Sequence, residues 1–188
     1  MSILDGMPKD EAELRRAIAF AVPIVEGAVR EMKLPERILS VLDELKDGLS
    51  LADIMGITKE QRDGLLAHGM RLLQLGEIAK AREVLIPLQQ LEPMDERTIY
   101  ALATSYQLEG NYSIAGKLYV YFLALDATNP EGHLRLGECF LGAKEYDNAE
   151  ESFDLALAFA KDAGDAACIA HATKMLEMTR TARAANGS

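Results

Sequence analysis

Apolar residues recur along this chain at helical spacing, in stretches separated by glycine, proline or polar residues. In the middle of the chain the pattern becomes a repeat with a period of 34 residues. Small and large apolar residues share this period in five columns: Gly69, Ala103 and Gly137; Ala81, Ala115 and Ala149; Leu85, Tyr119 and Phe153; Leu72, Tyr106 and Phe140; and Ile78, Tyr112 and Tyr146. The columns predict pairs of helices that cross closely at the small residues and pack through the large ones.

This period and this alternation are typical of tetratricopeptide repeats, which are helix–turn–helix units that stack into a solenoid. The sequence therefore predicts an all-α protein with three repeats, at about residues 62–95, 96–129 and 130–163. Helix-stop residues predict the break inside each repeat at Gly76, at Gly110 and at Gly142. Pro87 predicts a local kink in the second helix of the first repeat.

The regions that flank the repeats are predicted to be helical as well. Residues 1–9 are expected to be a flexible start, and a helix follows from about residue 11, with a kink at Pro23. A second helix begins near Pro35 and ends at Gly48. The first helix carries an apolar stripe of Leu14, Ile18, Ala21, Val22 and Val25, and the second carries Ile38, Val41, Leu42 and Leu45.

Two regions follow from this organisation. Residues 1–57 form an N-terminal helical region, and residues 58–188 hold the three repeats and a capping helix at residues 166–183. The amphipathic helices of residues 11–47 either mediate dimerisation or cap the array within one chain.

The first helices of such an array line its concave face, which makes that face the candidate binding site. Positions two, five, nine and twelve of each repeat point into it, because they share one side of a helix. These positions are Asp63, Leu66, Met70 and Leu73; Arg97, Tyr100, Thr104 and Gln107; and Glu131, Leu134, Glu138 and Leu141. The mixture of apolar and polar residues favours an extended peptide with spaced apolar anchors. For Leu66 and Leu134 the pattern fits the groove and the core equally well.

Composition and charge narrow the class of partner. The chain has 188 residues, of which 49% are apolar, and its net charge is −10 with a pI near 4.8. An acidic surface repels phosphate backbones and anionic lipid, so we expect no nucleic-acid partner. The longest apolar stretch, residues 17–29, is shorter than the roughly 20 residues that a membrane span requires, and the start lacks a signal peptide. We therefore expect no stable membrane insertion and a cytoplasmic location.

The sequence holds no motif for catalysis, for a metal or for a cofactor. Cys139 and Cys168 are expected to be free, buried thiols, although the sequence leaves a bridge between them open. His171 follows Cys168 by three residues, but a structural zinc site needs four ligands. The groove lacks the lysines and asparagines of a carboxylate clamp, and its cations, Arg97 and Arg135, are faced by carboxylates.

The run from residue 65 to residue 157 resembles the class II chaperones of bacterial type III secretion systems. The resemblance rests on GEIAKAREVL at residues 76–85, on GECFL at residues 137–141 and on a short apolar segment, residues 48–57, before three repeats. It covers residues 45–180. The N-terminal region is longer than is usual in that family and is interrupted by Pro23 and Pro35.

The resemblance implies a cytoplasmic chaperone that binds hydrophobic translocator proteins before export. It also implies a concave groove that takes an extended client segment, and a homodimer formed through N-terminal helices. The alternative is a tetratricopeptide-repeat scaffold or adaptor within a multi-protein assembly.

Overall fold

The fold was analysed in a computed structural model, which describes residues 2–5, 7, 12, 13, 15, 16, 19, 20, 23 and 35–186. Within these residues the structure is helical and contains no strand, which confirms the predicted fold class. The helices are α2 (Glu36–Lys46), α3 (Leu51–Ile54), α4 (Lys59–Gln74), α5 (Ile78–Leu91), α6 (Glu96–Leu108), α7 (Tyr112–Leu125), α8 (Pro130–Gly142), α9 (Tyr146–Ala163) and α10 (Ala166–Asn186). The predicted stripe of Leu14 to Val25 lies outside the described residues, but its described neighbours from 12 to 23 are helical.

The chain divides into two compact units. One unit contains residues 5–58, and the other contains residues 1–4 together with residues 59–188. In the first unit, α3 begins with a capping box in which Ser50 Oγ accepts from the Asp53 amide and Asp53 Oδ2 accepts from the Ser50 amide. The chain leaves the helical conformation after α2 at Gly48, whose φ is +90°, as the sequence predicts.

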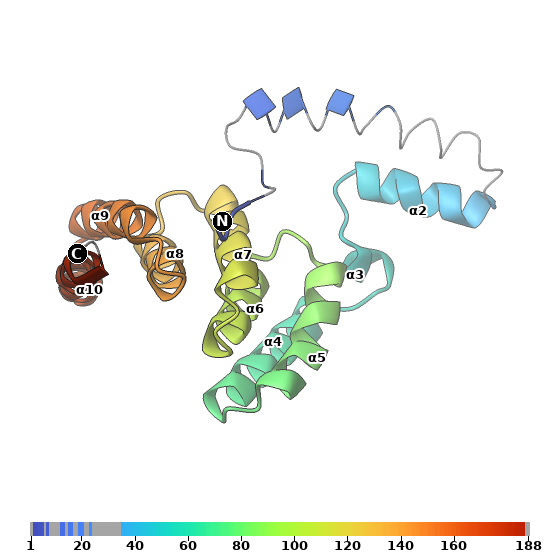
Figure 1. The fold of residues 1–188 in the computed structure, drawn as a ribbon. Coiled ribbons are helices and arrows are strands. Elements are labelled where there is room, and N and C mark those ends of the chain that lie inside the picture. The colour runs from blue at the N-terminus through green and yellow to red at the C-terminus, as the bar shows by residue number, and fades with distance from the viewer. Residues whose placement is uncertain are drawn as a thin grey trace. The chain divides into compact units, whose positions relative to one another are not determined.

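The second unit is a stack of antiparallel helix pairs (Figure 1). The pairs are α4 with α5, α6 with α7, and α8 with α9, and α10 packs on α9 and α8 at the end of the stack. Each pair corresponds to one predicted repeat. α5 continues through Pro87 without being split.

The turn inside each repeat has the same backbone geometry. It is left-handed at Gly76, Gly110 and Lys144, where φ is 76°, 76° and 63°. In each turn the next amide donates to a carbonyl five residues earlier, from Glu77 to Leu72, from Asn111 to Tyr106 and from Glu145 to Phe140, each at 2.9 Å. The predicted break at Gly142 is therefore wrong by two residues. Gly142 is the last residue of α8, and it lacks a side chain because a Cβ there would overlap the Tyr112 ring.

The small residues of the 34-residue columns receive the large ones. A Cβ on Gly69 would lie 2.7 Å from Leu85 Cδ2, and a Cβ on Gly137 would lie 2.6 Å from Phe153 Cε1. Because real Cβ contacts at these distances are repulsive, glycine is what allows the helices of these repeats to cross. Leu85 and Phe153 are consequently fully buried.

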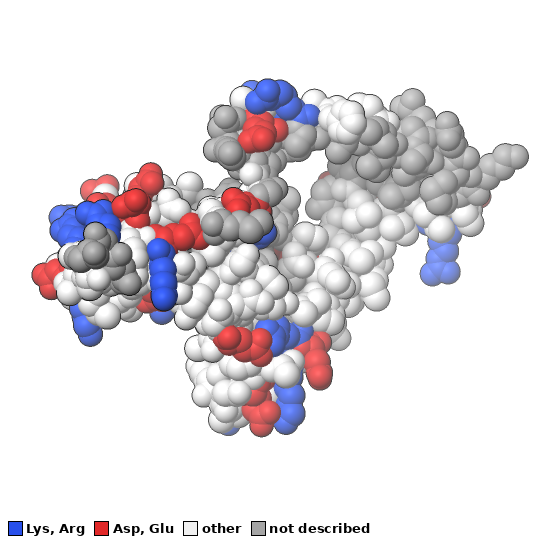
Figure 2. Space-filling model, viewed as in Figure 1, with Lys and Arg blue, Asp and Glu red and all other residues white. Residues whose placement is uncertain are grey.

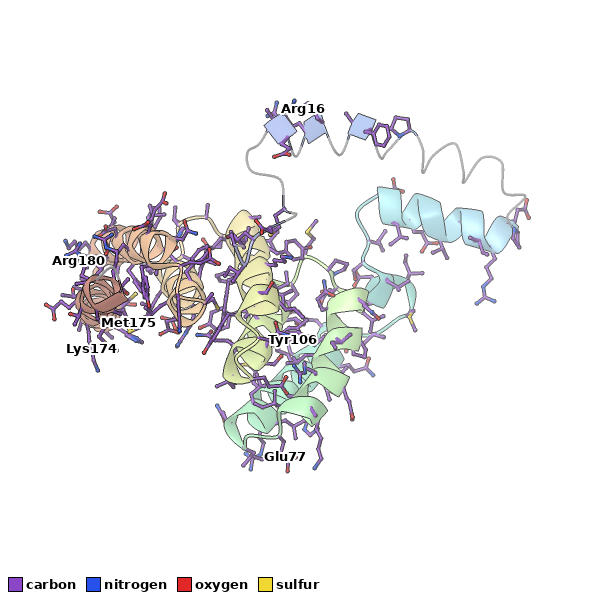
Figure 3. All side chains as sticks on the ribbon, in the orientation of Figure 1. Arg16, Glu77, Tyr106, Lys174, Met175 and Arg180 are labelled. Atoms are coloured by element: carbon purple, nitrogen blue, oxygen red, sulfur yellow. The ribbon has the colours of Figure 1, made fainter. Side chains whose placement is uncertain are left out.

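Two apolar clusters form the core of the array. The first repeat and the start of the second share one cluster, and the remaining repeats and α10 share the other. Tyr106 packs against both clusters, and Figure 3 shows it among the helices of the first two repeats. The guanidinium of Arg82 lies 4.7 Å from the centroid of the Tyr106 ring and forms an ion pair with Glu109. This contact joins the first repeat to the second.

Residues 2–4 differ from the flexible start that the sequence predicts for residues 1–9. Ile3 is only 7% exposed and belongs to the core cluster of the second and third repeats, and Leu4 packs against the same cluster. A branched apolar side chain removed from water accounts for this docking.

Candidate peptide-binding groove

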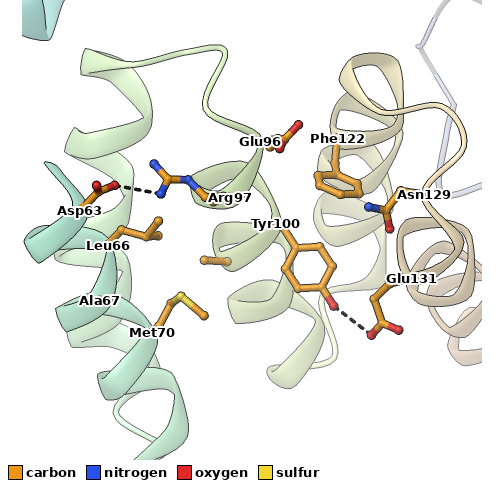
Figure 4. A pocket seen from close by; sticks show the side chains of 11 residues that line it. Asp63, Leu66, Ala67, Met70, Glu96, Arg97, Tyr100, Phe122, Asn129 and Glu131 are labelled. Atoms are coloured by element: carbon orange, nitrogen blue, oxygen red, sulfur yellow. Dashed lines mark hydrogen bonds and ion pairs between the residues drawn. The ribbon is translucent and has the colours of Figure 1, made fainter. Parts of the chain in front are cut away.

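A pocket of about 540 Å³ lies along the first helices of the array (Figure 4). The groove, as we call this surface, is lined by Asp63, Leu66, Ala67, Met70, Glu96, Arg97, Tyr100, Ala101, Phe122, Asn129 and Glu131. These residues come from α4, α6, α7, the residue before α8 and the first turn of α8. The groove thus crosses all three repeats.

Apolar side chains form the floor of the groove. Met70 is 46% exposed and Leu66 is 6% exposed, so Met70 offers surface to a ligand while Leu66 lies deeper. The Tyr100 ring meets the Phe122 ring edge to face, with 5.4 Å between centroids. A floor of this kind can receive an apolar side chain of a partner.

Ion pairs and hydrogen bonds border the floor. The Arg97 guanidinium lies 2.8 Å from Asp63, and the Tyr100 hydroxyl donates to Glu131 at 3.1 Å (Figure 4). Arg97 also lies 3.0 Å from Asp95. The partners of Arg97 raise its pKa, so it stays charged at any physiological pH. Both ends of the groove are therefore polar and internally paired.

Arg135 is the centre of a wider polar network beside the groove. Its guanidinium donates to Glu131 and Glu138, and its Nε also donates to the Tyr100 hydroxyl at 3.2 Å. Gln107 donates to Glu138 at 2.7 Å, and this bond links α6 to α8 a second time. The network holds neighbouring first helices together through charge-assisted hydrogen bonds.

The electrostatics of this network follow from burial and pairing. Burial raises the pKa of Tyr100, so its phenol is neutral and available as a donor. Burial opposes the charge of Arg135, but Glu138, Tyr100 and Glu131 outweigh it and raise the pKa of Arg135. Because Arg135 and Arg97 are both engaged by carboxylates, neither is free to clamp the terminal carboxylate of a peptide.

The structure brings together some of the predicted groove residues and separates others. Those that line the pocket are Asp63, Leu66, Met70, Arg97, Tyr100 and Glu131. Those that do not are Leu73, Thr104, Gln107, Leu134, Glu138 and Leu141. Leu134 is fully buried, so it packs in the core, and Leu73 and Leu141 pack against the core. Thr104, Gln107 and Glu138 lie in the polar network.

Other lining residues escaped the sequence pattern. Phe122 lies on α7, the second helix of its repeat, and reaches the groove because its ring packs on Tyr100. Asn129 caps α8 by accepting from the Gly132 amide. Helical periodicity of the first helices cannot identify either position, although the Asn129–Pro130 pair is a recognisable helix start.

The two thiols lie in the core, and one histidine faces a carboxylate. Cys139 and Cys168 are free and buried, and burial raises the pKa of the Cys139 thiol to about 12. His171 lies 3.3 Å from Glu138. No group of three or more His, Cys, Asp or Glu side chains suited to a metal ion occurs among the described residues.

Charge is distributed unevenly over the surface. In the view of Figure 2, charged side chains gather around α9 and α10 and around the ends of α4 and α5, and uncharged residues cover most of the area between them.

Within the part of the chain that the structure describes, no helix has the length and apolar character to cross a membrane.

The arrangement was compared with known proteins. No family model matches the sequence, and no curated protein matches it at a significant level. Three solved structures illustrate its structural similarity. A type III secretion complex from Aeromonas hydrophila is 25% identical, with a TM-score of 0.71, over 77% of this chain and 97% of that chain.

PcrH from Pseudomonas aeruginosa is 28% identical, with a TM-score of 0.62, over 65% of this chain and 94% of that chain. The translocator chaperone SycD of Yersinia enterocolitica is 24% identical, with a TM-score of 0.65, over 69% of this chain and 97% of that chain, and supports the fold alone. PcrH has also been solved with the chaperone binding regions of PopD and PopB.

Three stacked helix pairs with a groove along their first helices define a tetratricopeptide-repeat protein. Within that class, the chain is similar in fold to translocator chaperones of type III secretion systems, and the resemblance drawn from its sequence is confirmed.

Proposed function

We propose that this chain is a cytoplasmic chaperone of a bacterial type III secretion system and binds hydrophobic translocator proteins before their export. The apolar floor of the groove carries the proposal, because it can shield an apolar segment that would otherwise aggregate. PcrH, which is similar over most of its length, has been solved with the chaperone binding regions of PopD and PopB. Those complexes favour a chaperone over a general scaffold or adaptor.

In this proposal the client segment lies extended along the groove and places an apolar side chain between Met70 and Tyr100. Both residues line the pocket, and Met70 is exposed there. The polar groups of the neighbouring network are already paired with one another, so most of the binding energy comes from apolar contact. Neighbouring structures of this type are chaperones, a class without catalytic activity, and no cofactor enters the mechanism.

We also propose that the chain forms a homodimer through its N-terminal region. Ile38 and Leu45 of α2 are 44% and 40% exposed, although both are apolar. Association would remove these side chains from water.

Copurification tests the chaperone proposal. The tagged full-length chain, recovered from its native bacterium, should carry a secreted membrane-inserting protein that mass spectrometry identifies. Recovery of only cytoplasmic partners would contradict the proposal.

Substitutions then test the groove. Met70→Glu and Tyr100→Ala should each weaken binding of the recovered client by about thirtyfold, since each removes roughly 2 kcal/mol of apolar contact. Met94→Glu is the matched control, because Met94 is 71% exposed and does not line the pocket. Equal affinities for Met70→Glu and Met94→Glu, measured by calorimetry, would exclude the groove as the client site.

A further inference from the structure

The first residues of the chain bind to the array through both backbone and side chain. The Ile3 amide donates to Glu145 Oε1 at 2.6 Å, and the Ile3 carbonyl accepts from the Ser113 hydroxyl at 3.3 Å. These partners lie 142 and 110 residues further along the chain. Hydrogen bonds to both backbone polar groups of a residue, together with burial of its side chain, are typical of a bound peptide.

A missing side chain makes room for Ile3. A Cβ on Gly116 would lie 2.5 Å from Ile3 Cδ1 and 3.8 Å from Leu136 Cδ1. Ile3 thus occupies the space that the side chain of residue 116 would need, and Leu136 forms the other side of the pocket. Gly116 is buried under this contact.

The other repeats fill the equivalent position with their own side chains. The 34-residue register places Arg82, Gly116 and Glu150 in one column. Arg82 reaches across to Tyr106 and Glu109 of the following repeat, and Glu150 forms ion pairs with Arg180 and Arg183 of α10. Only at the junction between the second and third repeats does glycine leave the space open, and there Ile3 fills it.

This pocket is separate from the groove. Ser113 and Gly116 lie on α7, whereas most groove residues lie on first helices. On α8, Leu136 is five residues from Glu131 and two from Glu138, which turns it by roughly 140–160° from them around the helix. The two surfaces therefore lie on different sides of the array.

We propose that Ser113, Gly116, Leu136 and Glu145 form a second peptide-binding site, whose ligand is the segment Ser2–Leu4 of the same chain. The site recognises one backbone amide, one backbone carbonyl and one branched apolar side chain. When Ile3 occupies the site, it fills the space between the second and third repeats. Arg82 does the same between the first and second repeats. It also joins residues 5–58 to the array at both of their ends, at Leu4 and at Lys59.

Methyl NMR of the full-length chain tests this site directly. With isoleucine δ1 and leucine methyl groups labelled, the Ile3 δ1 methyl should show nuclear Overhauser effects to a Leu136 methyl and to Gly116 Hα. The Ile3→Val variant assigns the Ile3 resonance. An Ile3 methyl at its random-coil shift, with no such effects, would overturn the proposal.

A substitution in the site, with a matched control, then tests the pocket itself. Gly116→Arg gives the second repeat the residue that the first repeat has, and should abolish the Ile3 contacts and release residues 2–4. Gly64→Arg is the matched control, because a Cβ on Gly64 meets nothing within 4 Å, and it should leave those contacts intact. Persistence of the Ile3 contacts in Gly116→Arg would overturn the proposal.

Ile3→Asp tests the same site from the ligand side. It should shift the Leu136 methyl resonances and sharply lower the heteronuclear relaxation values of residues 2–5, with unchanged helicity by circular dichroism. Unchanged Leu136 resonances would contradict the site. A mixture of labelled and unlabelled chains completes the test, since effects seen only between different molecules would show the segment of a second copy in the site and would refute the assignment to the same chain.

Discussion

At the scale of single residues, backbone conformation locates the turn of the third repeat, whereas residue type alone misplaces it. Lys144 occupies the left-handed position that glycine occupies in the other two repeats, and it is exposed there. Its side chain makes this conformation unfavourable by about 1–2 kcal/mol. The preference for glycine at helix ends predicts Gly142 instead, although the 34-residue register places the turn at residue 144.

Replacing Lys144 with glycine should therefore stabilise the protein. We expect Lys144→Gly to raise the free energy of unfolding by about 0.5–1 kcal/mol, because glycine adopts a positive φ without strain but loses more entropy on folding. Lys174→Gly, in the middle of α10, is the control and should lower it by about 1 kcal/mol. Urea denaturation measures both changes, and destabilisation by Lys144→Gly would show that the lysine makes a favourable interaction.

A second residue-scale prediction concerns Asp95, at the start of α6. Burial favours its neutral form, but hydrogen bonds from Thr98 and Arg97 outweigh burial and lower the pKa of Asp95 below its ordinary value of 3.8. A lowered folded-state pKa means that the carboxylate stabilises the fold above 3.8, and that this contribution is lost as the pH falls through the folded-state pKa.

Asp95→Asn weakens the hydrogen bonds from Thr98 and Arg97, so it should cost about 1 kcal/mol of stability at neutral pH, and the difference from the wild type should narrow as the pH falls toward about 3. Urea denaturation at several pH values measures the difference. A difference that stays constant over this range would mean that the charge of Asp95 does not stabilise the fold.

At the scale of helices, the repeat columns predicted the pairs because each column has a packing cause. Glycine at 69 and 137 leaves space that Leu85 and Phe153 fill, so the small residues of one column and the large residues of the other meet at the same helix crossing. The same reasoning could not tell whether Leu134 lies in the groove or in the core, since a side chain on a first helix can face either of them. It also missed Phe122, which reaches the groove from a second helix.

The contact between Gly137 and Phe153 gives an element-scale prediction. Gly137→Ala places a methyl group 2.6 Å from a fully buried ring and should destabilise the protein by about 1–3 kcal/mol. Gly64→Ala adds the same methyl group to α4 in open space and should stabilise it by about 0.5–1 kcal/mol. Thermal denaturation compares the two, and a common sign would contradict the close crossing of α8 and α9.

At the scale of the whole molecule, local patterns predicted the array but not the contacts between distant segments. Helical periodicity reports on neighbours a few residues apart, so residues 2–4 looked like a free start. Their docking depends on the space above Gly116, more than 100 residues away. The groove is similarly assembled from three repeats. The 34-residue register predicts only those groove residues that lie on the first helix of a repeat.

Self-association is the last whole-molecule prediction. If the N-terminal region forms the dimer, a charge on the exposed apolar side of α2 should prevent association, because burying an unpaired carboxylate is costly. We expect Ile38→Glu combined with Leu45→Glu to give a mass near 20.6 kDa by light scattering, and the wild type to give twice that mass. Met94→Glu, at a 71% exposed position in the array, is the control and should remain dimeric. A monomeric wild type, or a double variant that remains dimeric with unchanged helicity, would assign these helices to another role.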